Sequence, residues 1–213
     1  MNAQATQKRA PEKPAEDSAK RRQIVEGARA VFLAQGFDAA SMSDIARAAG
    51  VSKGTLYVYF ENKEQLFVAI VEEECLGHAE GVFDLNPDDH DVEAALTRLG
   101  IAYVEFLCRP AKASALRTVL AIADRMPEIG KVFYETGPAF GIARLAAYLR
   151  AQTDAGILTV ADCDVAAAQF MDACQSTMFK PVMFNFSEAP SPPRIGHVVG
   201  IAVQTFLAAY RMR

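Results

Sequence analysis

Lys53, Thr55 and Tyr57 occupy alternate positions near the start of one short predicted helix. A lysine ammonium can donate to O6 and N7 of guanine, and a threonine methyl can contact the methyl group of thymine. Gly54 has no side chain, which would let the backbone approach a duplex closely. These residue types predict a segment that reads base edges in the major groove of DNA.

A second set of side chains is placed to bind the DNA backbone. Phosphate oxygens accept hydrogen bonds from hydroxyl and ammonium groups. Ser43 and Lys63 also stand at or near predicted helix starts, where the helix dipole favours an anion. The predicted phosphate contacts are Ser41, Ser43, Ser52, Tyr59 and Lys63. For Tyr57 and Tyr59 the alternative is packing within a small domain, the role that Leu56 and Phe60 are predicted to have.

Two short helices joined by a sharp turn would hold these side chains in place. Ser41 can cap the first helix, with Asp44 three residues later in the capping-box position. Gly50 stands where that helix must end, at a position that favours a residue tolerating positive φ. Ser52 can cap the second helix. The pattern therefore predicts a helix-turn-helix.

The run SMSDIARAAGVSKGTLYVYFENK, residues 41–63, resembles the signature of TetR-type transcriptional regulators. The tract PEIGKVFYETGPAFGIARLAAYL, residues 127–149, is similar to the ligand domain of many AcrR-like members. This resemblance implies a transcriptional repressor that binds a double-stranded DNA operator and is released from it by a small molecule. It also implies DNA contacts at the positions of Lys53, Thr55, Tyr57, Tyr59 and Lys63.

The rest of the chain predicts an all-α fold of about nine helices, because no segment shows the alternation of a strand. We expect a disordered arm over 1–19, a helix-turn-helix DNA-binding domain over 20–67 and a helical effector-binding and dimerisation domain over 68–213. The expected helices outside the helix-turn-helix cover 21–35, 62–78, 91–108, 113–125, 127–152 with a bend at Gly137-Pro138, 165–184 with a late kink at Pro181, and 194–210.

Charge is divided unevenly along the chain. In residues 1–60, lysines and arginines exceed carboxylates by three, and the remainder carries −7, which together give the net charge of −4. The excess of positive charge thus lies on the part predicted to meet DNA.

The last two predicted helices are apolar over more than one face, so both sides require a cover. A four-helix dimer interface, with two helices from each subunit, would provide it. A deeper core of a single chain is the alternative. The predicted dimer-interface residues are Phe170, Val182, Ile195, Val198, Val199, Ala202 and Phe206.

Aromatic and aliphatic helix faces in the second domain could line a cavity for an apolar or aromatic effector. The predicted lining residues are Tyr103, Phe106, Arg117, Leu120, Phe140, Arg144, Gln169, Phe170, Met171, Met178 and Phe179. For each of them, a place in the ordinary core is the alternative.

Other classes of protein find little support in the sequence. Four scattered cysteines without a C-x-x-C pair suit a reduced, cytoplasmic protein. No apolar run is long enough for a membrane span. The histidines are not spaced as metal ligands, and nucleophile-elbow, P-loop and dinucleotide signatures are missing, so we expect no catalytic residue, metal or cofactor. The alternatives are an architectural DNA-binding protein without an effector and an enzyme whose site is assembled from distant residues.

Overall fold

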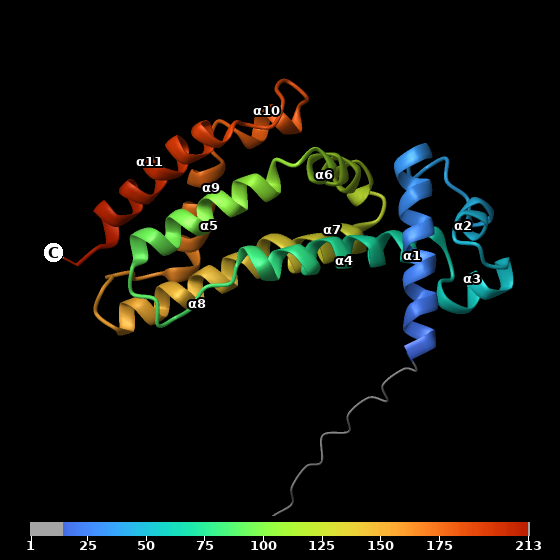
Figure 1. Cartoon of the computed structure of the whole chain (residues 1–213), viewed down its shortest axis with the longest axis horizontal. Helices are drawn as coiled ribbons and strands as arrows, with labels where there is room; N and C mark the ends of the chain where they lie inside the picture. The colour runs from blue at the N-terminus through green and yellow to red at the C-terminus, as the bar shows by residue number, and fades with distance from the viewer. Residues whose placement is uncertain (1–14, 213) are drawn as a thin grey trace, which may run out of the picture. The chain divides into compact units, whose positions relative to one another are not determined.

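The regular elements of the described residues are all helices. A computed structural model describes residues 15–212, apart from the side chains of residues 15–16, 74–80 and 111. Its elements are α1 (Ala15–Gln35), α2 (Met42–Ala48), α3 (Lys53–Tyr59), α4 (Lys63–Val82), α5 (Val92–Leu107), α6 (Pro110–Ala123), α7 (Pro127–Tyr134), the π-helical segment η1 (Glu135–Ala139), α8 (Phe140–Asp154), α9 (Cys163–Gln175), α10 (Phe179–Met183) and α11 (Pro192–Tyr210) (Figure 1). The predicted all-α class is confirmed.

Three details differ from the sequence predictions. Helix α1 already begins at Ala15, so residues 15–19 of the predicted arm are helical, while residues 1–14 lie outside the described residues. The bend predicted at Gly137-Pro138 is a single π turn that joins α7 to α8. The helix predicted over 165–184 is interrupted before Pro181, at Thr177, whose φ is 63°.

The interruption follows from the chemistry of proline. Pro181 has no N–H and its ring excludes a preceding helical turn, but it is tolerated in the first turn of a new helix. It occupies the third residue of α10. The chain therefore breaks upstream of the proline and restarts, where a kink at the proline was predicted.

The chain divides into two compact units, with the boundary between Ile70 and Val71, inside α4. In the first unit, α1, α2 and α3 and the start of α4 surround a core that includes Ile24, Ile45, Leu56 and Leu66. Helices α1 and α2 cross very closely. A Cβ atom at Gly27 would lie 2.6 Å from the backbone nitrogen of Ala49.

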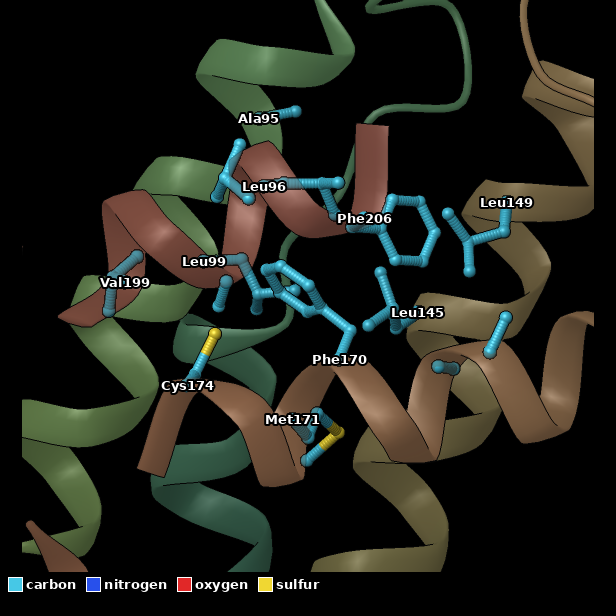
Figure 2. Close-up of a cluster of buried hydrophobic side chains, with 14 of the residues drawn as sticks. Ala95, Leu96, Leu99, Leu145, Leu149, Phe170, Met171, Cys174, Val199 and Phe206 are labelled. Atoms are coloured by element: carbon cyan, nitrogen blue, oxygen red, sulfur yellow. The ribbon is translucent and has the colours of Figure 1, made fainter. Parts of the chain in front are cut away.

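The second unit has a larger core between α5, α8, α9 and α11 (Figure 2). Leucines of α5 and α8 meet Phe170 of α9 and Phe206 of α11, whose rings are 5.5 Å apart in an edge-to-face arrangement. Gly100 lets α11 approach α5, since a Cβ there would lie 2.7 Å from Val199. This core fixes which faces of α9 and α11 remain outside.

A buried amide anchors the loop between α4 and α5 to this core. Gln152 is fully buried, and its Nε2 donates to the carbonyl of Pro87 over 2.7 Å. Its Oε1 then accepts from Nδ1 of His90 over 2.8 Å. The hydroxyl of Tyr148 donates to the carbonyl of Asp89. Both polar ends of Gln152 are therefore satisfied, as burial requires.

Candidate functional site

The start of α2 is fixed by the serine cap that the sequence predicts. The Oγ of Ser41 accepts from the backbone N–H of Asp44 over 3.2 Å, and the Ser41 hydroxyl donates to the Asp44 carboxylate. That hydrogen bond, with Arg47 at 3.0 Å, lowers the pKa of Asp44 below its ordinary value. The single hydroxyl proton of Ser41 is thereby engaged. The structure thus makes Ser41 a cap, and its contact with a phosphate stays a prediction.

The turn between α2 and α3 is built from backbone hydrogen bonds. Gly50 has a φ of 63°, the left-handed conformation that glycine adopts without strain. The N–H of Val51 donates to the carbonyl of Ala46 over 3.0 Å. From α1, the side-chain amide of Gln23 donates to the carbonyl of Ala49 over 2.7 Å. The angle between α2 and α3 is therefore held from both sides.

Helix α3 divides into a buried and an exposed face. Leu56 is fully buried, and Phe60 directly after the helix is also buried. Lys53, Gly54, Tyr57 and Val58 face outward, with Tyr57 52% and Val58 81% exposed. Sequence reasoning missed Val58 because its position varies within the motif.

Ser52 and Thr55 are hydrogen-bonded to each other at the start of α3. The Oγ of Ser52 accepts from the N–H of Thr55 over 3.0 Å, and the two hydroxyl oxygens lie 2.8 Å apart. One of the two hydroxyl protons is used between them, which leaves the other for an outside acceptor. Ser52 is exposed, and Thr55 is half-buried.

Tyr59 contacts α1. Its hydroxyl is hydrogen-bonded to the carboxylate of Asp17, which raises the pKa of Tyr59. The ring is half-buried against the core of the first unit. Of the two roles that the sequence left open for this residue, the structure shows packing.

Lys63 holds the loop between α1 and α2. Its ammonium donates to the carbonyls of Phe37, Asp38 and Ala40 over 2.8, 3.0 and 3.2 Å and lies 4.8 Å from the centre of the Phe37 ring. An ammonium has three N–H donors, and all three have acceptors here. Lys63 therefore positions this loop, and the phosphate contact predicted for it stays a prediction.

The predicted effector residues do not line one cavity. Phe170, Met171 and Met178 are buried in the main core, whereas Leu120 is 60% exposed and Arg144 and Gln169 are exposed. The guanidinium of Arg117 lies 3.5 and 3.4 Å from the carbonyls of Val182 and Met183. The remaining four residues, Tyr103, Phe106, Phe140 and Phe179, are half-buried. Leu120 is thus wrong as a lining residue, because it faces outward.

The predicted dimer-interface residues are mostly covered within the single chain. Six of them are buried, namely Phe170, Val182, Ile195, Val199, Ala202 and Phe206, and Val198 is half-buried. This burial supports the alternative of a deeper core for Val182, Ile195 and Val199. Phe170, Val198, Ala202 and Phe206 also line a surface groove, so the interface stays a prediction.

A groove runs along the outer side of α9 and α11. Its volume is about 480 Å³, and its lining residues are Ala166, Gln169, Phe170, Ala173, Ser176, Thr177, Arg194, His197, Val198, Ile201, Ala202, Thr205, Phe206, Ala209 and Tyr210. A smaller cavity of about 270 Å³ lies by the loop after α4, next to the Asp89–Arg98 ion pair. Only Phe170 and Gln169 of the predicted effector residues line either cavity.

Other chemistry is limited among the described residues. Cys108, Cys163 and Cys174 are buried free thiols, and burial raises the pKa of Cys174 to about 12. The side chain of Cys75 lies outside the described residues. Within the described range, no cluster of histidine, cysteine or carboxylate side chains could hold a metal ion. No described helix combines the length and apolar character needed to cross a membrane.

Fold and geometry together define a helix-turn-helix regulator, and comparisons with known proteins identify its family. Residues 24–70 match the description "Bacterial regulatory proteins, tetR family", and residues 94–212 match "AefR-like transcriptional repressor, C-terminal domain". The second match alone covers more than half of the chain. The chain therefore belongs to the TetR family of transcriptional regulators, which are not enzymes.

Individual relatives agree with this assignment. The structure of the flavonoid-responsive regulator FrrA is 32% identical, with a TM-score of 0.78 over 92% of this chain and 99% of that one. A TetR-family regulator of Pseudomonas syringae pv. tomato is 29% identical, with a TM-score of 0.71 over 91% and 98% of the two chains. The HTH-type transcriptional repressor Rv1474c of Mycobacterium tuberculosis is 31% identical over 51% of this chain. This chain spans about half the length of that repressor, 52%.

Proposed function

We propose that the protein is a transcriptional repressor that binds a near-palindromic operator as a dimer and is released by an apolar or aromatic small molecule. The observation that carries the proposal is the division of α3. Leu56 and Phe60 fix the helix to its unit, while Lys53, Gly54, Tyr57 and Val58 stay free on the other face. A short helix held this way suits insertion into the major groove.

The exposed face of α3 supplies the base contacts in this proposal. The ammonium of Lys53 would donate to guanine O6 and N7, and the methyl groups of Val58 would meet thymine methyls. Tyr57 would contact a base edge with its ring and hydroxyl. Ser43 and the free hydroxyl proton of the Ser52–Thr55 pair would bind phosphates.

Two copies would present two such helices to successive major grooves. Helix-turn-helix dimers bind half-sites about 34–36 Å apart, one turn of DNA, or multiples of that spacing. The outer face of α9 and α11 is the candidate surface for the second copy, since its groove combines small apolar residues with a polar rim. This surface includes four of the seven residues predicted from the sequence, namely Phe170, Val198, Ala202 and Phe206.

The proposed effector site lies at the half-buried aromatic residues of the second unit. Tyr103, Phe140 and Phe179 pack against the main core with part of each ring uncovered. Partly uncovered rings suit an aromatic ligand. FrrA is named for its response to flavonoids, so flavonoids are the first compounds to test. A ligand that prefers the arrangement unsuited to DNA would lower operator affinity by roughly 5- to 150-fold.

Sequencing DNA fragments that the purified protein selects from a random pool tests the DNA half of this proposal. We expect a site with two inverted half-sites. Lys53→Ala and Tyr57→Ala should lose roughly 1–3 kcal/mol of discrimination per base contact while the fold is retained. Selection of no common sequence would favour the architectural alternative. Titration of the operator complex with flavonoids and other aromatic compounds tests the effector half separately.

A further inference from the structure

Two phenylalanines on the turn after α10 are the most exposed large apolar side chains in the described part of the chain. Phe184 is 82% and Phe186 86% exposed. Fully burying such an aromatic ring removes about 150–250 Å² from water. Two adjacent uncovered rings therefore form a surface that gains strongly from being covered.

The turn that carries these rings is well defined by hydrogen bonds. The N–H groups of Phe186 and Ser187 both donate to the carbonyl of Pro181, over 2.8 and 3.3 Å. Asn185 has a φ of 53°, a left-handed conformation that asparagine tolerates better than most residues. The guanidinium of Arg117 holds the end of α10 from α6. The rings thus project from a built turn, and packing within this chain leaves them outside.

The groove on α9 and α11 offers a place for such rings. Its lining combines small or apolar residues, including Ala173, Ala202, Ala209 and Phe206, with polar ones such as Gln169, Ser176 and Thr205. Phe184 and Phe186 do not line this groove, so the exposed rings and the groove are separate features of the second unit. An aromatic anchor in an apolar pocket with a polar rim is the usual form of a binding hot spot.

We propose that each subunit of the dimer inserts Phe184 and Phe186 into the α9–α11 groove of its partner. The inference rests on the dimer proposed above and specifies how its two copies fit. A two-fold contact repeats reciprocally, so one symmetry operation covers both pairs of rings and fills both grooves. Neither these two rings nor this groove then stays open to a third copy, so the contact closes on itself.

An antiparallel arrangement of the two α11 helices predicts which end of the groove receives the rings. When two copies of one face meet, the two-fold axis lies in the plane of the contact, and a helix that runs across this axis is antiparallel to its copy in the partner. Phe186 lies shortly before the start of α11, which is 19 residues long, or about 28 Å. The turn of one subunit therefore meets the C-terminal end of the partner's helix, where Phe206, Ala209 and Tyr210 line the groove.

Sedimentation equilibrium of the full chain tests whether the rings anchor the dimer. Phe184→Ser with Phe186→Ser should raise the dimer dissociation constant at least about 30-fold, the effect of losing one hot-spot residue. Thermal unfolding should show that the fold persists, since both rings are exposed. Leu120→Ser, at a side chain that is 60% exposed on α6, is the matched control and should leave dimerisation unchanged.

Disulfide trapping tests the direction of insertion. In a Cys75→Ser background, where the other native cysteines are buried, subunits carrying Phe186→Cys are mixed with subunits carrying Ala209→Cys. We expect a covalent heterodimer from this pair and none from Phe186→Cys with His197→Cys, at the other end of the groove. The insertion would be overturned by trapping at His197, by no trapping at either site, or by an unchanged dimer after loss of both rings. None of these results would contradict the dimer itself. A monomeric wild type would overturn both proposals.

Discussion

Helices α3 and α11 each have one buried and one open face, but they differ in how the sequence encodes that division. Helix α3 has seven residues, a serine cap and one fully buried side chain, Leu56. Helix α11 buries six of its 19 residues and still exposes Ile201 at 52%. A short capped helix with one large apolar side chain can bury only one face. A long helix that is apolar on several sides could bury any of them, and the helices packed against it determine which one is buried.

Val199→Glu should give the largest effect and sharpens this comparison directly. Val199 is fully buried and lies where even a Cβ on Gly100 would come within 2.7 Å. A carboxylate there would be buried without a partner, so we expect the free energy of unfolding to fall by more than about 4 kcal/mol. Ile201→Glu, two residues away on the open face, should leave thermal unfolding nearly unchanged and weaken dimerisation. Denaturant unfolding and light scattering measure the two effects.

Equal behaviour of the two variants would contradict the assignment of faces. Folded monomers from both would mean that Val199 belongs to the subunit interface, as the sequence suggested. Unfolding of both would mean that Ile201 is covered within its own chain.

Much of the first unit could be predicted because its signals are local. The cap at Ser41, the turn at Gly50 and the buried Leu56 all follow from residues within a few positions of one another. The fold class and most helix ranges follow from periodicity in the same way. Val58 was missed because exposure at a variable position leaves no pattern in one sequence.

The second unit could be predicted only in outline. Apolar residues on α9 and α11 predicted that these helices are covered on both sides, but the sequence did not separate buried Val199 from residues such as Val198 that line the surface groove. Which face turns inward depends on Leu99 of α5 and Leu145 of α8, which come from other places in the chain (Figure 2). The break before Pro181 could be placed from its missing N–H, yet its exact residue, Thr177, required the structure.

Lys63→Met should lower stability less than Val199→Glu. Comparison with Lys53→Ala distinguishes a lysine that positions the loop between α1 and α2 from a lysine that contacts DNA. Loss of three hydrogen bonds from the Lys63 ammonium should lower the free energy of unfolding of the first unit by about 1–2 kcal/mol. Because these bonds go to the protein's own carbonyls, the salt dependence of DNA binding should stay as in the wild type. Lys53→Ala should change DNA binding without changing stability. A salt slope reduced by about one in Lys63→Met would show a phosphate contact instead.

Ser41→Ala should have the smallest effect, confined to the first unit and dependent on pH. Loss of a serine cap costs about 1 kcal/mol. The Ser41 hydroxyl is also the largest cause of the lowered pKa of Asp44. A carboxyl whose pKa is lower in the folded state stabilises above its unfolded pKa, and this contribution disappears as pH falls through the folded value. The cost of Ser41→Ala should therefore be greatest near pH 7 and shrink below the ordinary carboxyl pKa of 3.8. Native-state hydrogen exchange at pH 7 and pH 3 reports on the stability of each unit separately. In an Asp44→Asn background, the cost of Ser41→Ala should no longer depend on pH. An equal cost at pH 7 and pH 3 in the native background would show that the Ser41 hydroxyl acts on the backbone alone.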